Sequence, residues 1–290
     1  MEYKKILLAV SGGPDSMYML NKYKHLDVVV AYINYNQRED SYLDEQIVTD
    51  FCNKNKIKLE KLVLNKSDYI SGNFQDWARE KRFIFFKEIY YKYNRNILYI
   101  AHNLDDYLET AQMQLASNRT FSLLGIRKKS YLFNMNIYRP FLFRYFKDTI
   151  LKKCKKYNIP FHIDYTNNQN KYLRNIQRNK NKLLSKFQKI LILINIYLKN
   201  RKIHKNNQIT EKEYKIWLES NFAQEIFRFF LNKQELIYKF IHLNFDNIEL
   251  SSKKIQAIEK FILSNNRTSE FKLNDKNKLR KKKGKIIAKE

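Results

Sequence analysis

Short apolar runs and longer mixed stretches alternate along the first half of the chain. The apolar runs predict a buried strand at 4–10 and further strands at 26–33, 58–64 and 96–101. The stretches between them predict helices from Pro14 onward and over 41–56, 74–93 and 104–116. Strands that alternate with helices favour a parallel sheet covered by helices on both faces, so the predicted fold class is α/β.

The pattern changes in the second half of the chain. Residues 161–164 are short and apolar enough to form a last strand, and 173–198 predicts one long helix. No strand–helix alternation follows residue 200, and Ile255, Ile258 and Ile262 are spaced for one helix face. We therefore expect a catalytic domain over 1–185, a smaller helical region over 186–265, and a basic tail over 266–290 that is either a small β-ribbon or disordered.

Composition limits the functional classes. A chain of 290 residues with 44% hydrophobic residues can bury a substantial core, and its formal charge of +27 favours RNA, DNA or an anionic membrane as partner. A lysine-rich solvated surface gives the same charge. Cys52 and Cys154 lie far apart and have no CxxC partner, so neither a disulfide framework nor a zinc site is indicated. The N-terminus lacks a secretory h-region and the apolar run 190–198 is too short to cross a bilayer, so we expect a soluble cytoplasmic protein.

The segment between the first strand and the first helix has the composition of a phosphate loop. Backbone N–H groups at such a turn converge on an anion, with the helix dipole behind them. There is no lysine before the serine, as a Walker A loop requires, and a carboxylate at this place suits Mg2+ bound to a nucleotide. A tight glycine turn without a ligand is the alternative. The residues are Ser11, Gly12, Gly13, Pro14, Asp15 and Ser16, with Asp15 as the candidate metal ligand.

Two further groups of charged residues fall near the expected ligand edge of the sheet. Asp106 and Glu109 lie three residues apart, so they share a helix face and suit a cation or a substrate ammonium; complementation of the helix dipole is the alternative. Arg174 and Arg178 lie one helical turn apart, so together they suit a phosphate or carboxylate, or else a solvated face.

Several of these segments resemble a known family. SGGPDS resembles the PP-loop of the N-type ATP pyrophosphatases, and Ala-His-Asn-Leu-Asp-Asp-Tyr-Leu-Glu-Thr (101–110) resembles the AHHxDDxxET signature of the tRNA(Ile)-lysidine synthetases. QDWAREKRF (75–83) resembles the ExxARxxRY segment of that family, and Gly125-Ile126 and Arg139-Pro140-Phe141 match short blocks. The DxxN…RNxxR segment is matched by Asp164, Asn167, Arg174, Asn175 and Arg178. The resemblance covers roughly residues 4–180, and the chain departs from it with Tyr35 and Asn103, where the family commonly has histidines.

The resemblance implies an ATP-dependent ligase that joins lysine to C2 of the first anticodon cytidine of an isoleucine tRNA with a CAU anticodon. The reaction passes through an adenylated base and releases pyrophosphate and AMP. The implied catalytic residues are Asp15, Asp106, Glu109 and Arg178, with ATP and Mg2+ at 11–16. The implied substrate-binding residues are Arg38, Arg79, Arg82, His102, Asp105, Arg174 and Asn175. The oligomeric state is left open.

Two other functions are compatible with the sequence. A tRNA 2-thiolation enzyme shares the PP-loop, but it commonly needs paired cysteines, which Cys52 and Cys154 supply only if folding brings them together. A nonenzymatic RNA-binding protein on a nucleotide-binding scaffold accounts for the charge alone. For the ligase we expect the helical region and tail to hold the tRNA body while the α/β domain does the chemistry; a lysine-rich end that touches nothing is the alternative. The basic residues that cluster in the tail are Lys278, Arg280, Lys281, Lys282 and Lys283.

Overall fold

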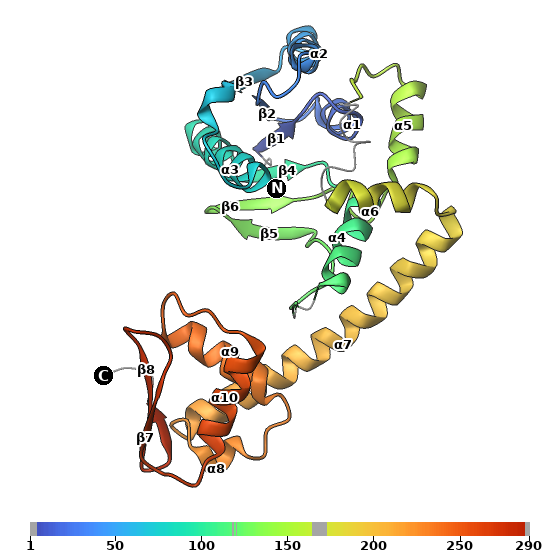
Figure 1. Cartoon of the computed structure of the whole chain (residues 1–290). Coiled ribbons are helices and arrows are strands. Elements are labelled where there is room, and N and C mark those ends of the chain that lie inside the picture. Colours follow the sequence, from blue (N-terminus) through green and yellow to red (C-terminus); the bar gives the residue numbers. More distant parts are fainter. Residues whose placement is uncertain (1–4, 118, 120, 164–172, 288–290) are drawn as a thin grey trace. The chain divides into compact units, whose positions relative to one another are not determined.

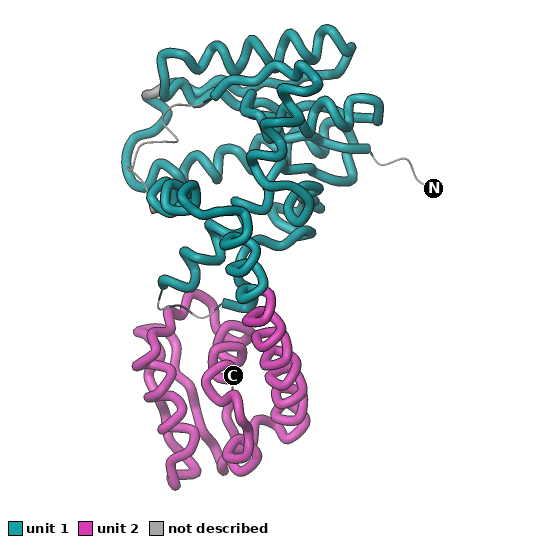
Figure 2. The backbone as a smooth tube through the Cα atoms, turned by 90° about the vertical axis from the view of Figure 1, so that its right-hand side faces the viewer, with its two compact units in different colours: residues 1–196 teal, residues 197–290 magenta. Residues whose placement is uncertain are grey.

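The computed structural model describes residues 5–117, 119, 121–163 and 173–287. The chain forms two compact units, residues 1–196 and 197–290, which are coloured separately in Figure 2.

The first unit is built on a six-stranded sheet with the order β3-β2-β1-β4-β6-β5 (Figure 1). β1 lies in the middle, where Ile6 is paired with Val28 of β2 on one side and with Ile97 of β4 on the other, both in parallel. β5 runs antiparallel to β6 at the edge. The strands are β1 (Ile6–Val10), β2 (Val28–Asn34), β3 (Lys58–Val63), β4 (Ile97–Ile100), β5 (Lys129–Leu132) and β6 (Met135–Tyr138).

Helices cover both faces of this sheet, because alternate side chains of its strands are apolar on both sides. Ile6 and Leu8 pack into a core with residues of α1, α2 and α5, whereas Leu7 packs on the other face with Phe83 and Phe86 of α3. The predicted α/β class is confirmed. The helices of this unit are α1 (Pro14–Tyr23), α2 (Ser41–Lys54), α3 (Phe74–Lys92), α4 (Leu104–Ala116), α5 (Lys147–Lys156), α6 (Leu173–Lys182) and the first part of α7 (Lys186–Glu219).

The hairpin of β5 and β6 is absent from the sequence prediction. Its two-residue turn, Phe133 and Asn134, has φ of 52° and 61°, a conformation that favours glycine and asparagine. Phenylalanine at the first of these positions gives no turn signal. Its ring stacks on Phe83, with centroids 5.0 Å apart, and this tertiary contact supports the strained position.

Two predicted elements are wrong. Residues 161–163 form no strand, because the backbone N–H of His162 donates to the Gly12 carbonyl at 3.1 Å instead of joining the sheet; Asp164 lies outside the described residues. The helix predicted over 173–198 is interrupted between α6 and α7. There Ser185 and Gln188 form a reciprocal capping box, with Ser185 N–H to Gln188 Oε1 at 2.8 Å and Gln188 N–H to Ser185 Oγ at 3.2 Å.

The second unit is helical, as predicted, and ends in a small antiparallel sheet. Trp217, Phe227 and Phe240 form the centre of its core, and Ile258 and Ile262 of α10 pack against the same core. None of the helices among the described residues of either unit is long and apolar enough to cross a membrane. Besides the second part of α7, the elements are α8 (Gln224–Phe227), α9 (Lys233–Asn244), α10 (Ser252–Leu263), β7 (Ser269–Lys272), β8 (Lys278–Lys282) and β9 (Lys285–Ile287).

The basic tail therefore forms strands over much of its length and supplies core residues. Leu279 and Ile286 are buried in the core of the unit. The expectation that Lys281 contacts phosphate is wrong, because β8 turns alternate side chains inward and Lys281 is only 1% exposed. Its ammonium donates to the Phe261 carbonyl at 2.8 Å and to the Ser264 carbonyl at 3.1 Å, at the end of α10.

Candidate active site

The phosphate loop connects β1 to α1 and is held open by its two serines and its glycines. Ser16 Oγ accepts the backbone N–H of Ser11 at 3.1 Å and donates to the Gly13 carbonyl at 2.9 Å. Gly12 has φ of +80°, and a Cβ there would lie 2.8 Å from the Cβ of Asp44, so a larger residue does not fit. Within the described chain no side chain caps the first turn of α1, which leaves its N–H groups directed at the loop.

Asp15 stands in the first turn of α1 and faces the start of α4. Asn103 Nδ2 donates to Asp15 Oδ1 at 3.1 Å. Burial, and then the nearby charge of Asp106, raises the pKa of Asp15 to about 7. The charged form of this carboxylate is disfavoured, so a cation beside it would stabilise that form. The described residues contain no group of three His, Cys, Asp or Glu suited to a metal, so Mg2+ would fit here with Asp15 as one ligand and ATP phosphates and water as the others.

The start of α4 carries a complete capping box that also shapes the site. Asn103 Oδ1 accepts the N–H groups of Asp105 and Asp106, while Asp106 Oδ2 accepts the Asn103 N–H at 2.9 Å. Asn103 is one of the two departures from the family pattern. Its side chain thus joins Asp15 of the phosphate loop to the first turn of α4. One carboxylate oxygen of Asp106 therefore caps the helix.

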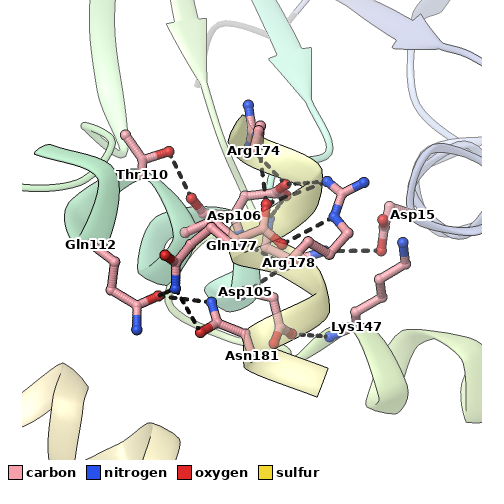
Figure 3. A network of polar contacts seen from close by, with 12 residues as sticks. Asp15, Asp105, Asp106, Thr110, Gln112, Lys147, Arg174, Gln177, Arg178 and Asn181 are labelled. Carbon is pink, nitrogen blue, oxygen red and sulfur yellow. Dashed lines mark hydrogen bonds and ion pairs between the residues drawn. The ribbon is translucent and has the colours of Figure 1, made fainter. Parts of the chain in front are cut away.

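The other oxygen of Asp106 and both oxygens of Glu109 contact arginines of α6 (Figure 3). Arg174 lies 3.0 Å from Asp106 Oδ1 and 3.3 Å from Glu109 Oε2. Arg178 donates to both oxygens of Glu109, at 3.0 and 3.3 Å. Glu109 is only 2% exposed, so its charge is balanced by these guanidinium groups. The predicted acidic pair and the predicted basic pair therefore meet, next to Asp15.

Asp105 points away from this cluster. Its Oδ2 accepts the backbone N–H of Lys147 at the start of α5, at 2.8 Å, and its Oδ1 lies 2.7 Å from the ammonium of Lys189 on α7. Both oxygens hold neighbouring helices in place. The substrate-binding role that the sequence predicts for Asp105 remains a prediction, and these contacts favour a positioning role instead.

Arginine side chains form a basic cluster around His102, two residues after β4. The Nε of Arg139 donates to His102 Nδ1 at 3.0 Å, which leaves the imidazole proton on Nε2. Burial is the main cause that lowers the pKa of His102 to about 4, and the charges of Arg139, Arg174 and Arg82 lower it further. The imidazole is therefore neutral at physiological pH and offers one N–H donor.

Two more arginines that the sequence predicts as substrate-binding, Arg79 and Arg82, lie on α3 near this basic cluster. Arg82 donates to Tyr35 Oη at 3.1 Å, so the tyrosine that replaces a family histidine orients this guanidinium. Arg79 packs over the Phe83 ring at 4.9 Å. Asn175 lies on α6, in the same turn as Arg174.

Arg38 lies on the other side of the phosphate loop. It forms ion pairs with Asp40, at 3.3 Å, and with Asp44, the residue packed against Gly12. The ring of His162 lies 3.4 Å from Asp44 Oδ1, and its backbone N–H holds Gly12. The sequence prediction named only Arg38 of this group.

The residues that sequence reasoning missed are Arg139, Asp44, His162 and Lys147. Arg139 stood in a segment that matches a family block, which was the available signal. The charge of Lys147 acts on Asp15, and Figure 3 shows the two side chains beside Arg178. No motif marks Asp44, His162 or Lys147, because their place depends on how distant segments meet.

Comparison with known proteins gives one consistent answer. A family profile described as a PP-loop domain matches residues 1–184. The chain is 46% identical to the tRNA(Ile)-lysidine synthase of Mycoplasmopsis pulmonis over 92% of this chain and 93% of that protein. It is 37% identical to the enzyme of the same name from Mesomycoplasma hyopneumoniae, over 99% of this chain and 96% of that protein.

Among solved structures, the U34-tRNA thiolase NcsA from Methanococcus maripaludis has a similar fold, with a TM-score of 0.57, 16% identity and coverage of 69% of this chain and 74% of that chain. This likeness concerns the fold alone. The phosphate loop, the sheet and the level of identity to the two synthases agree with each other. The chain therefore belongs to the tRNA(Ile)-lysidine synthase family of ATP-dependent ligases.

Proposed function

We propose that this protein joins the ε-amine of free lysine to C2 of the first anticodon cytidine in an isoleucine tRNA with a CAU anticodon. ATP, free lysine and tRNA are all present in the cytoplasm, where we place the reaction. The observation that carries the proposal is the cluster of Asp106, Glu109, Arg174 and Arg178 beside Asp15 and the phosphate loop. This cluster supports the proposal, because an acidic pair suited to an amine lies next to a loop suited to the phosphates of ATP.

In the first step, O2 of the cytidine attacks the α-phosphate of ATP and pyrophosphate leaves. The N–H groups at the start of α1 bind the phosphates, and Asp15 is the protein ligand for Mg2+. Bound Mg2+ neutralises charge on the phosphate oxygens. Lys147 and Arg178, whose charges act on Asp15, face the same region and stabilise the departing pyrophosphate.

The anticodon binds beside the basic cluster around His102. The target base lies in a single-stranded loop, so the protein reaches its edge without opening a duplex. Arg79, Arg82 and Arg174 suit the anticodon phosphates, and the neutral His102 donates one hydrogen bond from Nε2.

In the second step, lysine attacks C2 and AMP leaves with the original O2. A lysine ammonium has a pKa of about 10.4 in water, so the site must remove its proton before attack. Asp106 and Glu109 are proposed to receive the ammonium and then accept that proton. Since both carboxylates already contact arginines, the incoming ammonium displaces a guanidinium from Glu109. The displaced Arg174 or Arg178 then contacts the AMP phosphate.

The geometry disfavours the thiolation alternative. Cys52 and Cys154 are both fully buried in one core cluster. Burial raises the pKa of the Cys52 thiol to about 12 and that of Cys154 to about 11, so both are protonated and unreactive. A nonenzymatic RNA-binding role does not explain the buried contacts of Asp15 and Glu109.

Nucleoside mass spectrometry tests this function. The enzyme is incubated with the CAU-anticodon tRNA, ATP, Mg2+ and lysine labelled with 15N, and the digested nucleosides are compared with reactions that omit one substrate. We expect a cytidine derivative that carries the label only in the complete reaction. A thiolated base, or ATP turnover without a lysine adduct, contradicts the proposal.

A further inference from the structure

The loop between α8 and α9 exposes two large apolar side chains in a row of three residues. Phe229 is 83% exposed and Leu231 is 80% exposed, whereas Phe230 between them is 7% exposed. Phe230 points inward and contacts Phe227, with ring centroids 6.2 Å apart. Two large apolar side chains that are exposed within one short loop favour an interaction surface.

The backbone of this loop is fixed. Glu213 on α7, only 9% exposed, accepts the N–H of Leu231 at 2.7 Å and the N–H of Asn232 at 3.2 Å. The Asn232 side chain donates to Thr210 Oγ1 at 3.0 Å. A buried carboxylate and a buried phenylalanine thus hold the loop, so the exposure of Phe229 and Leu231 is part of the fold. A rigid aromatic group loses little entropy when it binds.

The charge of the second unit favours a polyanion as the partner, and the proposed function supplies one in the tRNA substrate. Residues 197–290 contain 22 lysines and arginines and 11 aspartates and glutamates. Arg228, directly before Phe229, has an exposed side chain. An apolar protein partner does not require this charge, whereas RNA does. Aromatic side chains beside guanidinium groups are the usual platform for unpaired bases, which every nucleotide offers through its π-face.

We propose that Phe229 stacks on an unpaired base of the tRNA substrate, with Leu231 against the edge of that base and Arg228 on the adjoining phosphate. The proposal rests on the proposed function for its choice of RNA. The stacking contact would bind tRNA with an affinity that does not depend on salt concentration, whereas the phosphate contacts of the second unit depend on it. The Phe229–Leu231 loop is therefore a tRNA-holding element of the second unit.

The test compares Phe229→Ala, Phe229→Leu and Phe229→Trp by filter binding of tRNA across a salt series. Loss of one stacked base costs about 1–3 kcal/mol, so Phe229→Ala should weaken tRNA binding about 5- to 150-fold. The slope of log Kd against log salt should stay unchanged, because no phosphate contact is lost. Phe229→Trp should retain affinity, and Phe229→Leu should resemble Phe229→Ala.

Leu243→Ala is the matched control, because Leu243 is also exposed, at 64%, on α9. It should leave tRNA affinity unchanged, and all four variants should melt like the parent protein.

Equal affinity of Phe229→Ala and the parent, or of Phe229→Leu and Phe229→Trp, overturns the proposal. A change in mass by light scattering with unchanged RNA affinity assigns the loop to a protein contact instead. A parent protein that binds tRNA through Phe229 but forms no lysine adduct overturns the proposed function and leaves this proposal standing.

Discussion

The two units of this protein are both basic, but they use their charges in opposite ways. In the first unit, Arg174 and Arg178 are paired with the buried carboxylates of Asp106 and Glu109 at the ligand edge of the sheet. In the second unit, Lys281 is buried among backbone carbonyls, while Lys282 beside it is exposed. A net charge of +27 therefore does not identify which lysines and arginines contact a substrate. The partners that each of these side chains has in the fold identify them.

The largest expected effect comes from the first unit. Asp15→Asn should lower the rate of tRNA adenylation at least about 100-fold, because it removes the proposed protein ligand of Mg2+ beside the phosphates. The affinity for tRNA should stay within a few fold. Pyrophosphate release and filter binding measure the two quantities, and unchanged turnover would remove Asp15 from the mechanism.

Glu109→Gln should act later in the reaction. It keeps the shape of the side chain but removes the charge that faces Arg174 and Arg178, so the lysine step should slow about 10- to 100-fold. The lysine concentration required should rise as well, while pyrophosphate release continues. Glu213→Gln makes the same chemical change at the buried carboxylate of the second unit. An equal rise in the lysine requirement in both variants would argue against a specific role for Glu109.

Lys281→Met tests the buried cation of the second unit. The substitution removes the ammonium that donates to the carbonyls of Phe261 and Ser264, so it should lower the free energy of unfolding by about 1–3 kcal/mol. Lys282→Met on the exposed side of β8 should change stability by less than about 0.5 kcal/mol, but it should reduce the salt dependence of tRNA binding. Denaturant unfolding and a salt series separate the two. If Lys281→Met changes the salt dependence and not the stability, the inward assignment is wrong.

The smallest effect concerns pH and Asp15. Its pKa is 3.8 ordinarily and about 7 in the fold, so between these values the folded state keeps a proton that the unfolded state has lost. Stability of the protein without ATP and Mg2+ should therefore fall as the pH rises from 4 toward 7. Asp15→Asn has no such titration, so its Tm should exceed that of the parent at pH 8 and match it near pH 4. Asp148→Asn, an exposed site on α5, should give a curve parallel to the parent.

Much of the first unit was predictable because each of its early strands and helices carries its own periodic pattern. The predicted helix 104–116 coincides with α4, and the phosphate loop falls between β1 and α1 as expected. The ion pairs of Glu109 with α6 join residues about seventy positions apart, so periodicity does not specify them.

The errors have local physical causes. The β5–β6 turn uses Phe133 at positive φ, where the sequence offers no glycine, and a contact with Phe83 compensates. The break before α7 was readable as a Ser-x-x-Gln capping box at Ser185, but the apolar run after it favoured one continuous helix. The inward side chain of Lys281 follows from strand alternation, which a lysine-rich tail conceals.

The tail also changes how tRNA binding should be tested. Its Leu279 and Ile286 belong to the core of the second unit, so a chain stopped after Asn266 loses core packing together with charge. Single substitutions at Lys282 or Lys283 on the exposed surface remove charge alone.

The central claim is that Asp15 serves adenylation and Glu109 serves the lysine step within one cluster. A single-turnover reaction with tRNA, lysine and ATP labelled in the α-phosphate follows adenylated tRNA and lysine-modified tRNA together in time. The account predicts that Glu109→Gln accumulates adenylated tRNA that converts slowly to product, and that Asp15→Asn accumulates neither. Equal loss of adenylated tRNA in both variants would contradict it.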